Sequence, residues 1–374
     1  MTISRICNED IPVPGRTIMN DFVIEKVSTH EKYEGLRDLW ASVFGDEPDF
    51  VDAFYSNFGA DLSFRSESDE ISGFVICNDD GRVVSALTLY RCGSLYVPRE
   101  YVMDPDDDEE YAEYDPALLD ADGMPVYVSY AICTDPEYRG QGLAAALTQY
   151  VREFVTSDTG PGGISLVSPA EHSLIGFYSE LGYSEGFYVS EGIGFPEMLE
   201  LSEDFDEDYD ELYDEPEDES LIWGLGPDGA PGLIEDEEGF EAFEPEMSIV
   251  RADTAIYDRY REAFLSDTVH VSLSRNMLNL IRMCSLDGNG LLVINGGDAV
   301  AVMDETGRIA EELLVNPMLM DISSEIEAEI AARIAMSFGL ERLTYRTPGY
   351  GISQSMYAAS ADLEITGYYG FPIE

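Results

Sequence analysis

The chain has 374 residues, of which 45% are hydrophobic and 11% aromatic, so it is long enough for two or three domains with packed cores. It carries 20 Lys and Arg against 76 Asp and Glu, a formal net charge of −56. So large a negative charge excludes nucleic acid and anionic membranes as expected partners and favours cationic ligands. A solvated acidic surface, typical of an acidic proteome, explains the same charge, and we prefer that interpretation.

Cysteine and histidine are scarce. The five cysteines form no Cys-x-x-Cys pair, and the three histidines are scattered. We therefore expect reduced thiols and no metal site. The sequence has neither the roughly 20 consecutive apolar residues of a membrane span nor the apolar core of a signal peptide. These features predict a cytoplasmic protein.

The first half of the chain alternates strand and helix patterns. Residues 1–20 contain two prolines and a glycine without periodicity, and we expect a loose leader. Residues 98–123 are rich in carboxylates and are expected to form an inserted surface loop. Apolar spacing predicts the following elements: strands at 22–27, 73–77, 82–90, 126–134 and 164–167, a strand starting at 186, and helices at 33–44, 48–58, 143–155 and 174–181.

An acidic segment then divides the chain. Twelve carboxylates lie within residues 203–219, and we interpret residues 196–246 as a linker or long loop. The second half is predicted to contain strands at 248–251, 290–295, 299–303, 309–315 and 343–346, and helices at 256–265 and 322–338. Its order of hairpin, strand, helix and strand repeats the order in residues 73–167. This repetition predicts a diverged internal duplication.

The strand at 126–134 leads into a turn that contains Gly140 and Gly142 and then opens a helix. Glycines let a ligand approach the backbone, and the first amides of a helix have no partners within it. The helix dipole also favours negative charge at that end, so this junction suits a pyrophosphate. The chain has no GxxxxGK[ST] motif, which argues against a nucleoside triphosphatase. The alternative is that the two glycines only make a tight turn.

The arrangement of Arg139, Gly142 and Ala144 after a strand, with the sequence FYSELGY at 177–183, resembles the GNAT superfamily of N-acetyltransferases. These motifs cover residues 126–183, and the preceding elements extend the resemblance to residue 22. The SPAEHSLIGFYSELGY version and the two-part chain are similar to Eis-like members. The resemblance implies a mixed α/β sheet. It assigns residues 21–195 to an acetyl-CoA-binding GNAT domain and residues 247–374 to a degenerate GNAT-like domain.

The resemblance also implies roles for particular residues. The strand edge would bind the pantetheine arm, and Tyr178 would be the general acid that protonates the departing thiolate. For Tyr178 the alternative is a core contact. The second half has no glycine at its equivalent junction, residues 315–321. It is therefore expected to form one wall of the acceptor pocket and not to bind a cofactor. The cofactor-binding residues implied for the first half are Ala131, Ile132, Cys133, Arg139, Gly140, Gln141, Gly142, Leu143 and Ala144.

The general base is left open. Many members of the family carry a glutamate on the strand before the glycine turn, but residues 127–130 contain no carboxylate. Glu171, just before the Tyr178 helix, is one candidate. Glu374 is another, because Eis-like proteins bring their C-terminus into the site. A water relay is the third.

The sequence therefore predicts an N-acetyltransferase that moves an acetyl group from acetyl-CoA to a primary amine of a small molecule or peptide. The charge favours a cationic acceptor. One alternative is a catalytically silent module that binds coenzyme A or another protein, which the missing strand glutamate and the degenerate second half would suit. Transfer from a charged RNA is a further alternative, but the net charge opposes it. An oligomer is compatible with the sequence.

Overall fold

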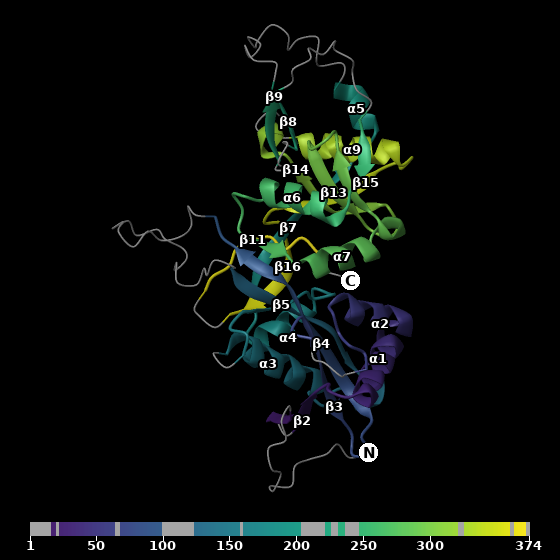
Figure 1. Cartoon of the computed structure of the whole chain (residues 1–374), viewed down its shortest axis with the longest axis vertical. Helices are drawn as coiled ribbons and strands as arrows, with labels where there is room; N and C mark the ends of the chain where they lie inside the picture. The colour runs from purple at the N-terminus through teal and green to yellow at the C-terminus, as the bar shows by residue number, and fades with distance from the viewer. Residues whose placement is uncertain are drawn as a thin grey trace, which may run out of the picture.

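The computed structural model describes residues 16–19, 22–63, 68–98, 123–157, 160–202, 221–225, 231–235, 247–320, 325–359 and 363–371. The predicted acidic loop at 98–123 lies outside these residues apart from its two ends, as does the carboxylate run at 203–219. The N-terminal half lies at one end of the long axis and most of the C-terminal half at the other (Figure 1). Among the described residues, no helix has the length and apolarity that crossing a membrane requires.

The N-terminal half follows the predicted order of elements closely. Thr29 caps the first helix by accepting a hydrogen bond from the Lys32 amide, Gly45 ends that helix at a φ of 83°, and Pro48 stands at the start of the second. In chain order the elements are β1 (Arg16–Met19), β2 (Phe22–Lys26), α1 (His30–Phe44), α2 (Pro48–Asn57), β3 (Ile71–Cys77), β4 (Val83–Tyr96), β5 (Met124–Thr134), α3 (Leu143–Thr156), β6 (Ile164–Val167), α4 (Leu174–Glu180) and β7 (Ser184–Gly194).

The C-terminal half contains more elements than its sequence pattern predicted. The strand β11, the helix α7 and the strand β16 were not predicted, and the acidic segment contains a short helix and two strands. In chain order the elements are α5 (Glu197–Ser202), β8 (Leu221–Leu225), β9 (Pro231–Glu235), β10 (Ile249–Arg251), α6 (Thr254–Phe264), β11 (His270–Leu273), α7 (Arg275–Cys284), β12 (Leu291–Ile294), β13 (Ala299–Met303), β14 (Ile309–Val315), α8 (Pro317–Met320), α9 (Ile326–Ser337), β15 (Leu343–Pro348) and β16 (Ile352–Ala358).

Residues 16–19 differ from the expected loose leader, because they form β1 and pair antiparallel with β2. A four-residue strand is too short to show a hydrophobic period in the sequence. Its hydrogen-bonding partner is what defines it.

The repeated order of elements is matched by a repeated topology. In the N-terminal half β4 and β5 are antiparallel, α3 crosses over, and β6 lies parallel to β5. In the C-terminal half β13 and β14 are antiparallel, α9 crosses over, and β15 lies parallel to β14. The predicted succession of hairpin, strand, helix and strand is therefore confirmed in both halves.

The two halves share one continuous sheet. Its strand order is β1-β2-β3-β4-β5-β6-β16-β7-β15-β14-β13-β12-β10, and β11 pairs with the far end of β4. Strand β16 from the C-terminal half therefore lies between β6 and β7 of the N-terminal half. The domain boundary predicted near residue 195 therefore separates the two halves in sequence, but strands of both halves belong to the same sheet.

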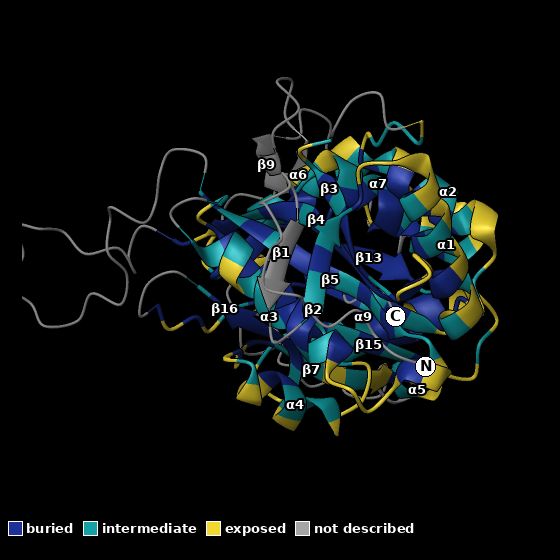
Figure 2. Ribbon diagram, turned by 90° about the horizontal axis from the view of Figure 1, so that it is seen from below, coloured by how far each residue is buried: buried dark blue, intermediate teal, exposed yellow. Residues whose placement is uncertain are grey.

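Helices cover both faces of the N-terminal part of the sheet. Helices α1 and α2 pack on one face through Leu36, Trp40 and Phe54, and α3 packs on the other through Leu147 and Val151. Figure 2 shows the dark, buried strands between these helices. Each fully buried side chain of this size stabilises the fold by about 1.5–3 kcal/mol. This packing fixes where β5 ends and α3 begins, which is where the candidate site lies.

Candidate active site

The start of α3 forms an anion cradle, which we define as the turn of residues 139–142 and the first amides of the helix. Gly140 and Gly142 have φ angles of 75° and 82°, in the region that favours glycine. Gly142 is the N-cap, and no side chain caps the helix. The space where a Cβ of either glycine would lie is open. The amides at this helix end are therefore available to an anion.

A cavity of about 440 Å³ lies over this cradle. Gln141 does not line it and is exposed, and Ala131 lines the neighbouring cavity instead. The other seven predicted cofactor residues line this cavity together: Ile132, Cys133, Arg139, Gly140, Gly142, Leu143 and Ala144.

Side chains outside the cradle hold its turn in place. Arg82 pairs with Asp135 at 2.8 Å, and the Asn78 amide donates a hydrogen bond of 3.1 Å to the buried Tyr138 hydroxyl. Arg139 is exposed and donates from Nε to the Thr134 carbonyl at 3.2 Å. The turn is thus fixed to the β3–β4 hairpin, and the guanidinium of Arg139 stands beside the glycines.

Strand β5 carries a bulge next to the cradle. Ala131 has a φ of 47°, and the register between β4 and β5 shifts between Ala86 and Thr88. On its other side β5 pairs with β6 only from Val126 to Val128. Beyond Val128 this edge of β5 has no strand partner among the described residues, which leaves backbone groups for an extended ligand arm.

Next to this unpaired edge of β5 lies a chamber of about 290 Å³. Tyr178 lines it from α4 and is 8% exposed. The chamber and the cavity over the cradle share Phe44 and Ile132 in their linings, so the two spaces adjoin. The structure thus brings the predicted general acid and the predicted cofactor residues to one continuous site.

Burial raises the pKa of Tyr178 to about 12. Its hydroxyl is therefore protonated at neutral pH and can donate. Burial also raises the pKa of the neighbouring Cys133 thiol to about 12.

The chamber receives neither predicted carboxylate base from the described residues. Glu171 is exposed and accepts a hydrogen bond of 3.2 Å from Ser173, whereas its neighbour Ala170 lines the chamber. Glu374 lies outside the described residues. Both remain predictions.

Three polar residues of the chamber were missed by the sequence analysis. Asp46, in the link between α1 and α2, lines the chamber and accepts a hydrogen bond of 2.6 Å from Trp40 Nε1. Ser129 and Tyr369 also line the chamber, and both side chains are buried. Nothing in the sequence distinguished Asp46 from the other 75 acidic residues, or these hydroxyls from other core hydroxyls.

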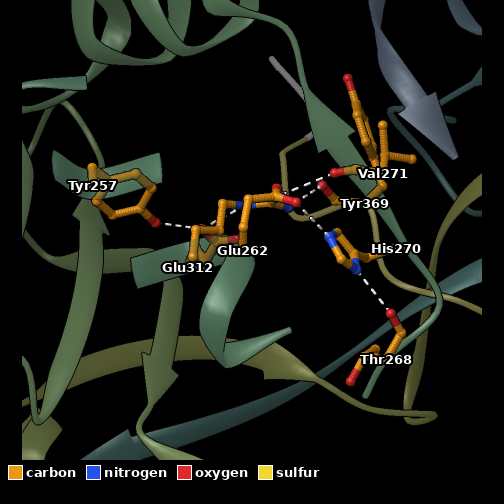
Figure 3. A network of polar contacts seen from close by, with 8 residues as sticks. Tyr257, Glu262, Thr268, His270, Val271, Glu312 and Tyr369 are labelled. Carbon is orange, nitrogen blue, oxygen red and sulfur yellow. Dashed lines mark hydrogen bonds and ion pairs between the residues drawn. The ribbon is translucent and has the colours of Figure 1, made fainter. Parts of the chain in front are cut away.

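Tyr369 is held in the chamber wall by a buried polar network (Figure 3). Arg261, fully buried on α6, donates from Nη2 to the Tyr369 carbonyl at 3.2 Å and from Nη1 to the Val271 carbonyl at 3.0 Å. Its Nε lies 3.1 Å from the carboxylate of Glu312, which also accepts a hydrogen bond from the Tyr257 hydroxyl. The C-terminal half therefore fixes one wall of a site whose other walls belong to the N-terminal half.

Beyond Asp46 the chamber adjoins a second space, which we call the acidic groove. It has a volume of about 730 Å³, and Asp46 and Tyr130 line both spaces. The groove lies between the α1–α2 link, the end of α7 and the turn between β13 and β14. The residues that line it are Asp46, Phe50, Tyr130, Ile281, Met283, Cys284, Ser285, Asp287, Gly288, Val302, Met303, Asp304, Glu305, Thr306, Ile309, Glu311 and Phe371.

The model of the Acetyltransferase (GNAT) family matches residues 31–183. Among solved structures, a probable N-acyltransferase from Enterococcus faecalis is 12% identical with a TM-score of 0.53, covering 90% of this chain and 72% of that chain. A GCN5-related N-acetyltransferase from Anabaena variabilis is 12% identical with a TM-score of 0.52, covering 90% of this chain and 73% of that chain. At these identities the likeness shows the fold alone.

Eis1 from Mycobacterium abscessus is also similar, at 10% identity and a TM-score of 0.47, covering 87% of this chain and 65% of that chain. A similarity of this size carries no argument about the chain. No curated protein matches at a significant level. Residues 31–183 therefore match the GNAT acetyltransferase family, and the fold of the chain as a whole is that of solved GNAT proteins.

Proposed function

We propose that this protein transfers an acetyl group from acetyl-CoA to a primary amine of a small molecule or peptide. The observation that carries the proposal is the continuity between the uncapped start of α3 and the chamber of Tyr178. The cradle amides would hold the pyrophosphate, and the free edge of β5 would hold the pantetheine arm. The thioester would then reach the chamber.

In the reaction, the neutral amine attacks the thioester carbonyl carbon, and a nitrogen–carbon bond forms. The tetrahedral intermediate collapses with cleavage of the carbon–sulfur bond, and Tyr178 donates its proton to sulfur. The proton that the amine loses passes to a carboxylate or to water, and solvent reprotonates Tyr178. Apolar and aromatic side chains enclose most of the chamber. The donated hydrogen bond therefore acts in surroundings of low dielectric constant, where it is stronger than in water.

The first prediction tests Tyr178 directly. Tyr178→Phe removes the donated proton without changing the shape of the side chain, so kcat should fall about 100-fold or more. Affinity for acetyl-CoA, measured by calorimetry, should stay within about twofold, because Tyr178 does not line the cradle. Turnover is measured by release of free thiol with a panel of amines.

Tyr183→Phe is the matched control. Tyr183 is also buried, but its hydroxyl bonds to Ser165 at 2.9 Å and it does not line the chamber. This variant should keep nearly full turnover. Unchanged turnover in Tyr178→Phe would remove that residue from the mechanism. Binding of acetyl-CoA without turnover on any amine would favour the silent module, and absence of binding would overturn both functions.

A further inference from the structure

We propose that Cys77 and Lys32 form a redox-sensitive pair, in which a hydroperoxide oxidises the Cys77 sulfur and the Lys32 amine then closes a covalent sulfur–nitrogen bridge. The observation that carries the proposal is a contact, because Lys32 Nζ lies 2.9 Å from Cys77 Sγ and donates a hydrogen bond to it. Neither residue lines the cavity over the cradle or the chamber of Tyr178. The proposal is therefore independent of the acetyl transfer described above.

The backbone holds both members of the pair in place. Lys32 lies in the first turn of α1, where its amide donates to the Thr29 cap, and Cys77 is the last residue of β3. The register between β3 and β4 shifts between Ile76 and Cys77, and bulges of this kind redirect a side chain. A helix and a strand thus bring the nitrogen to the sulfur, so a bond between them needs little rearrangement of the chain.

The charge of the lysine prepares the sulfur for oxidation. Partial burial lowers the pKa of Lys32, but the hydrogen bond to Cys77 and the charges of Cys77, Glu25 and Glu31 raise this pKa above its ordinary value. Glu25 also lies within ion-pair distance, at 3.7 Å from Lys32 Nζ. Lys32 is therefore an ammonium group at neutral pH. An ammonium beside a thiol favours the thiolate, which is the form that attacks an oxidant.

The other described cysteines compete poorly for the oxidant. Cys92 and Cys133 are buried, and burial raises the pKa of each thiol to about 12. Burial also raises the pKa of Cys284 to about 11. These three thiols stay protonated at neutral pH. Cys77 is only half-buried and the Lys32 side chain is 24% exposed, so a small oxidant can reach the pair.

The chemistry needs no reagent other than the hydroperoxide. With hydrogen peroxide, the Cys77 thiolate attacks one oxygen, so that a sulfur–oxygen bond forms and the oxygen–oxygen bond breaks. The departing hydroxide takes a proton from the Lys32 ammonium and leaves as water. The neutral amine then attacks the sulfur of the sulfenic acid, a nitrogen–sulfur bond forms, the sulfur–oxygen bond breaks and a second water leaves. The sulfur is oxidised and the peroxide reduced in the first step, and the second step is a condensation.

The test is treatment of the reduced full chain with a few equivalents of hydrogen peroxide, followed by intact mass measurement and peptide mapping. The bridged protein should be about 2 Da lighter than the reduced protein, because two hydrogen atoms are lost. Digestion should give a cross-linked species that joins the peptide of Lys32 to the peptide of Cys77, and dithiothreitol should separate them. A disulfide would cause the same loss of mass, but mapping would identify it by its two cysteines.

Lys32→Arg is the most informative variant, because arginine keeps a positive charge beside the sulfur but stays protonated and does not attack it. Oxidation of this variant at Cys77 should stop at the sulfenic acid, which is about 16 Da heavier than the thiol and is trapped by dimedone. Lys26→Arg is the matched control, since it makes the same change at the only other lysine of the chain. It should form the bridge as the wild type does, and Cys77→Ser should form neither product.

Three results would overturn the proposal. The first is oxidation that falls mainly on cysteines other than Cys77. The second is a Lys32→Arg variant that loses as much mass as the wild type. The third is a wild-type chain in which Cys77 is oxidised but never becomes joined to Lys32.

Discussion

At the scale of single residues, Asp258 on α6 is held in an unfavourable ionised form. Burial is the main reason that its pKa is raised to about 6. The charges of Glu262 and Glu312 also raise the pKa, whereas Arg261 and His270 lower it. Its Oδ1 is buried without a hydrogen-bond partner. The folded chain therefore binds this proton more tightly than the unfolded chain, in which the pKa of aspartate is about 3.9.

We expect Asp258→Asn to stabilise the protein at pH 8 by about 1–2 kcal/mol, less than the full shift implies because the side chain is partly solvated. The sign follows from the raised pKa, since the ionised form carries a cost above pH 6 that is lost as pH falls toward 4. The difference between variant and wild type should shrink accordingly between pH 8 and pH 5 in urea unfolding. Asp267→Asn, which removes the same charge from an exposed position, is the matched control.

At the scale of elements, the junction of β5 and α3 was the most predictable part of the molecule. The strand, the two glycines and the helix all occur where the apolar pattern predicted them. Local backbone sterics explain this, because a φ near 80° before an uncapped helix leaves few alternatives to glycine. What the local pattern did not contain was the bulge at Ala131, which depends on the register between β5 and β4.

Gly142→Ala should lower affinity for coenzyme A about tenfold and destabilise the chain by about 1–2 kcal/mol, the usual cost of a left-handed alanine. A Cβ at this position meets no other atom of the protein, so the loss of affinity would reflect the cradle and not a clash. Gly162→Ala is the control, since Gly162 has a φ of 67° and similarly open surroundings but lines no cavity of the site. Gly162→Ala should cost similar stability and leave the affinity for coenzyme A unchanged. Equal affinities for coenzyme A in the two variants would contradict the proposal that the cradle binds it.

At the scale of the whole molecule, the Arg261–Glu312 pair joins parts of the chain that are far apart in sequence. Both side chains are fully buried, and Arg261 also holds the carbonyls of Val271 and Tyr369. Strand β11, which contains Val271, pairs with β4, and Tyr369 lines the chamber. The pair thus links the C-terminal half to the sheet and the site of the N-terminal half.

Glu312→Ala should destabilise the chain by about 3–5 kcal/mol in urea unfolding, because it leaves a buried guanidinium unpaired. Arg261→Met combined with Glu312→Leu should recover most of this loss, since apolar side chains of similar volume need no partner. Arg251→Ala, which breaks a pair exposed to solvent, should change stability by less than about 1 kcal/mol. A cost below that level for Glu312→Ala would argue against this role for the pair.

The sequence alone was sufficient to determine the class of fold, most helices and strands of the N-terminal half, the repeated order of the C-terminal half and the two-glycine turn at the start of α3. These features depend on periodicity and backbone sterics within short stretches of chain. The roles of the cradle and of Tyr178 stay proposals. Only the tertiary structure decided that β11 and β16 complete the N-terminal sheet and that Asp46, Ser129 and Tyr369 meet Tyr178 in one chamber. Strand pairing and cavity walls arise from contacts between distant segments, and a carboxylate such as Asp46 differs from its many neighbours only in what those contacts place beside it.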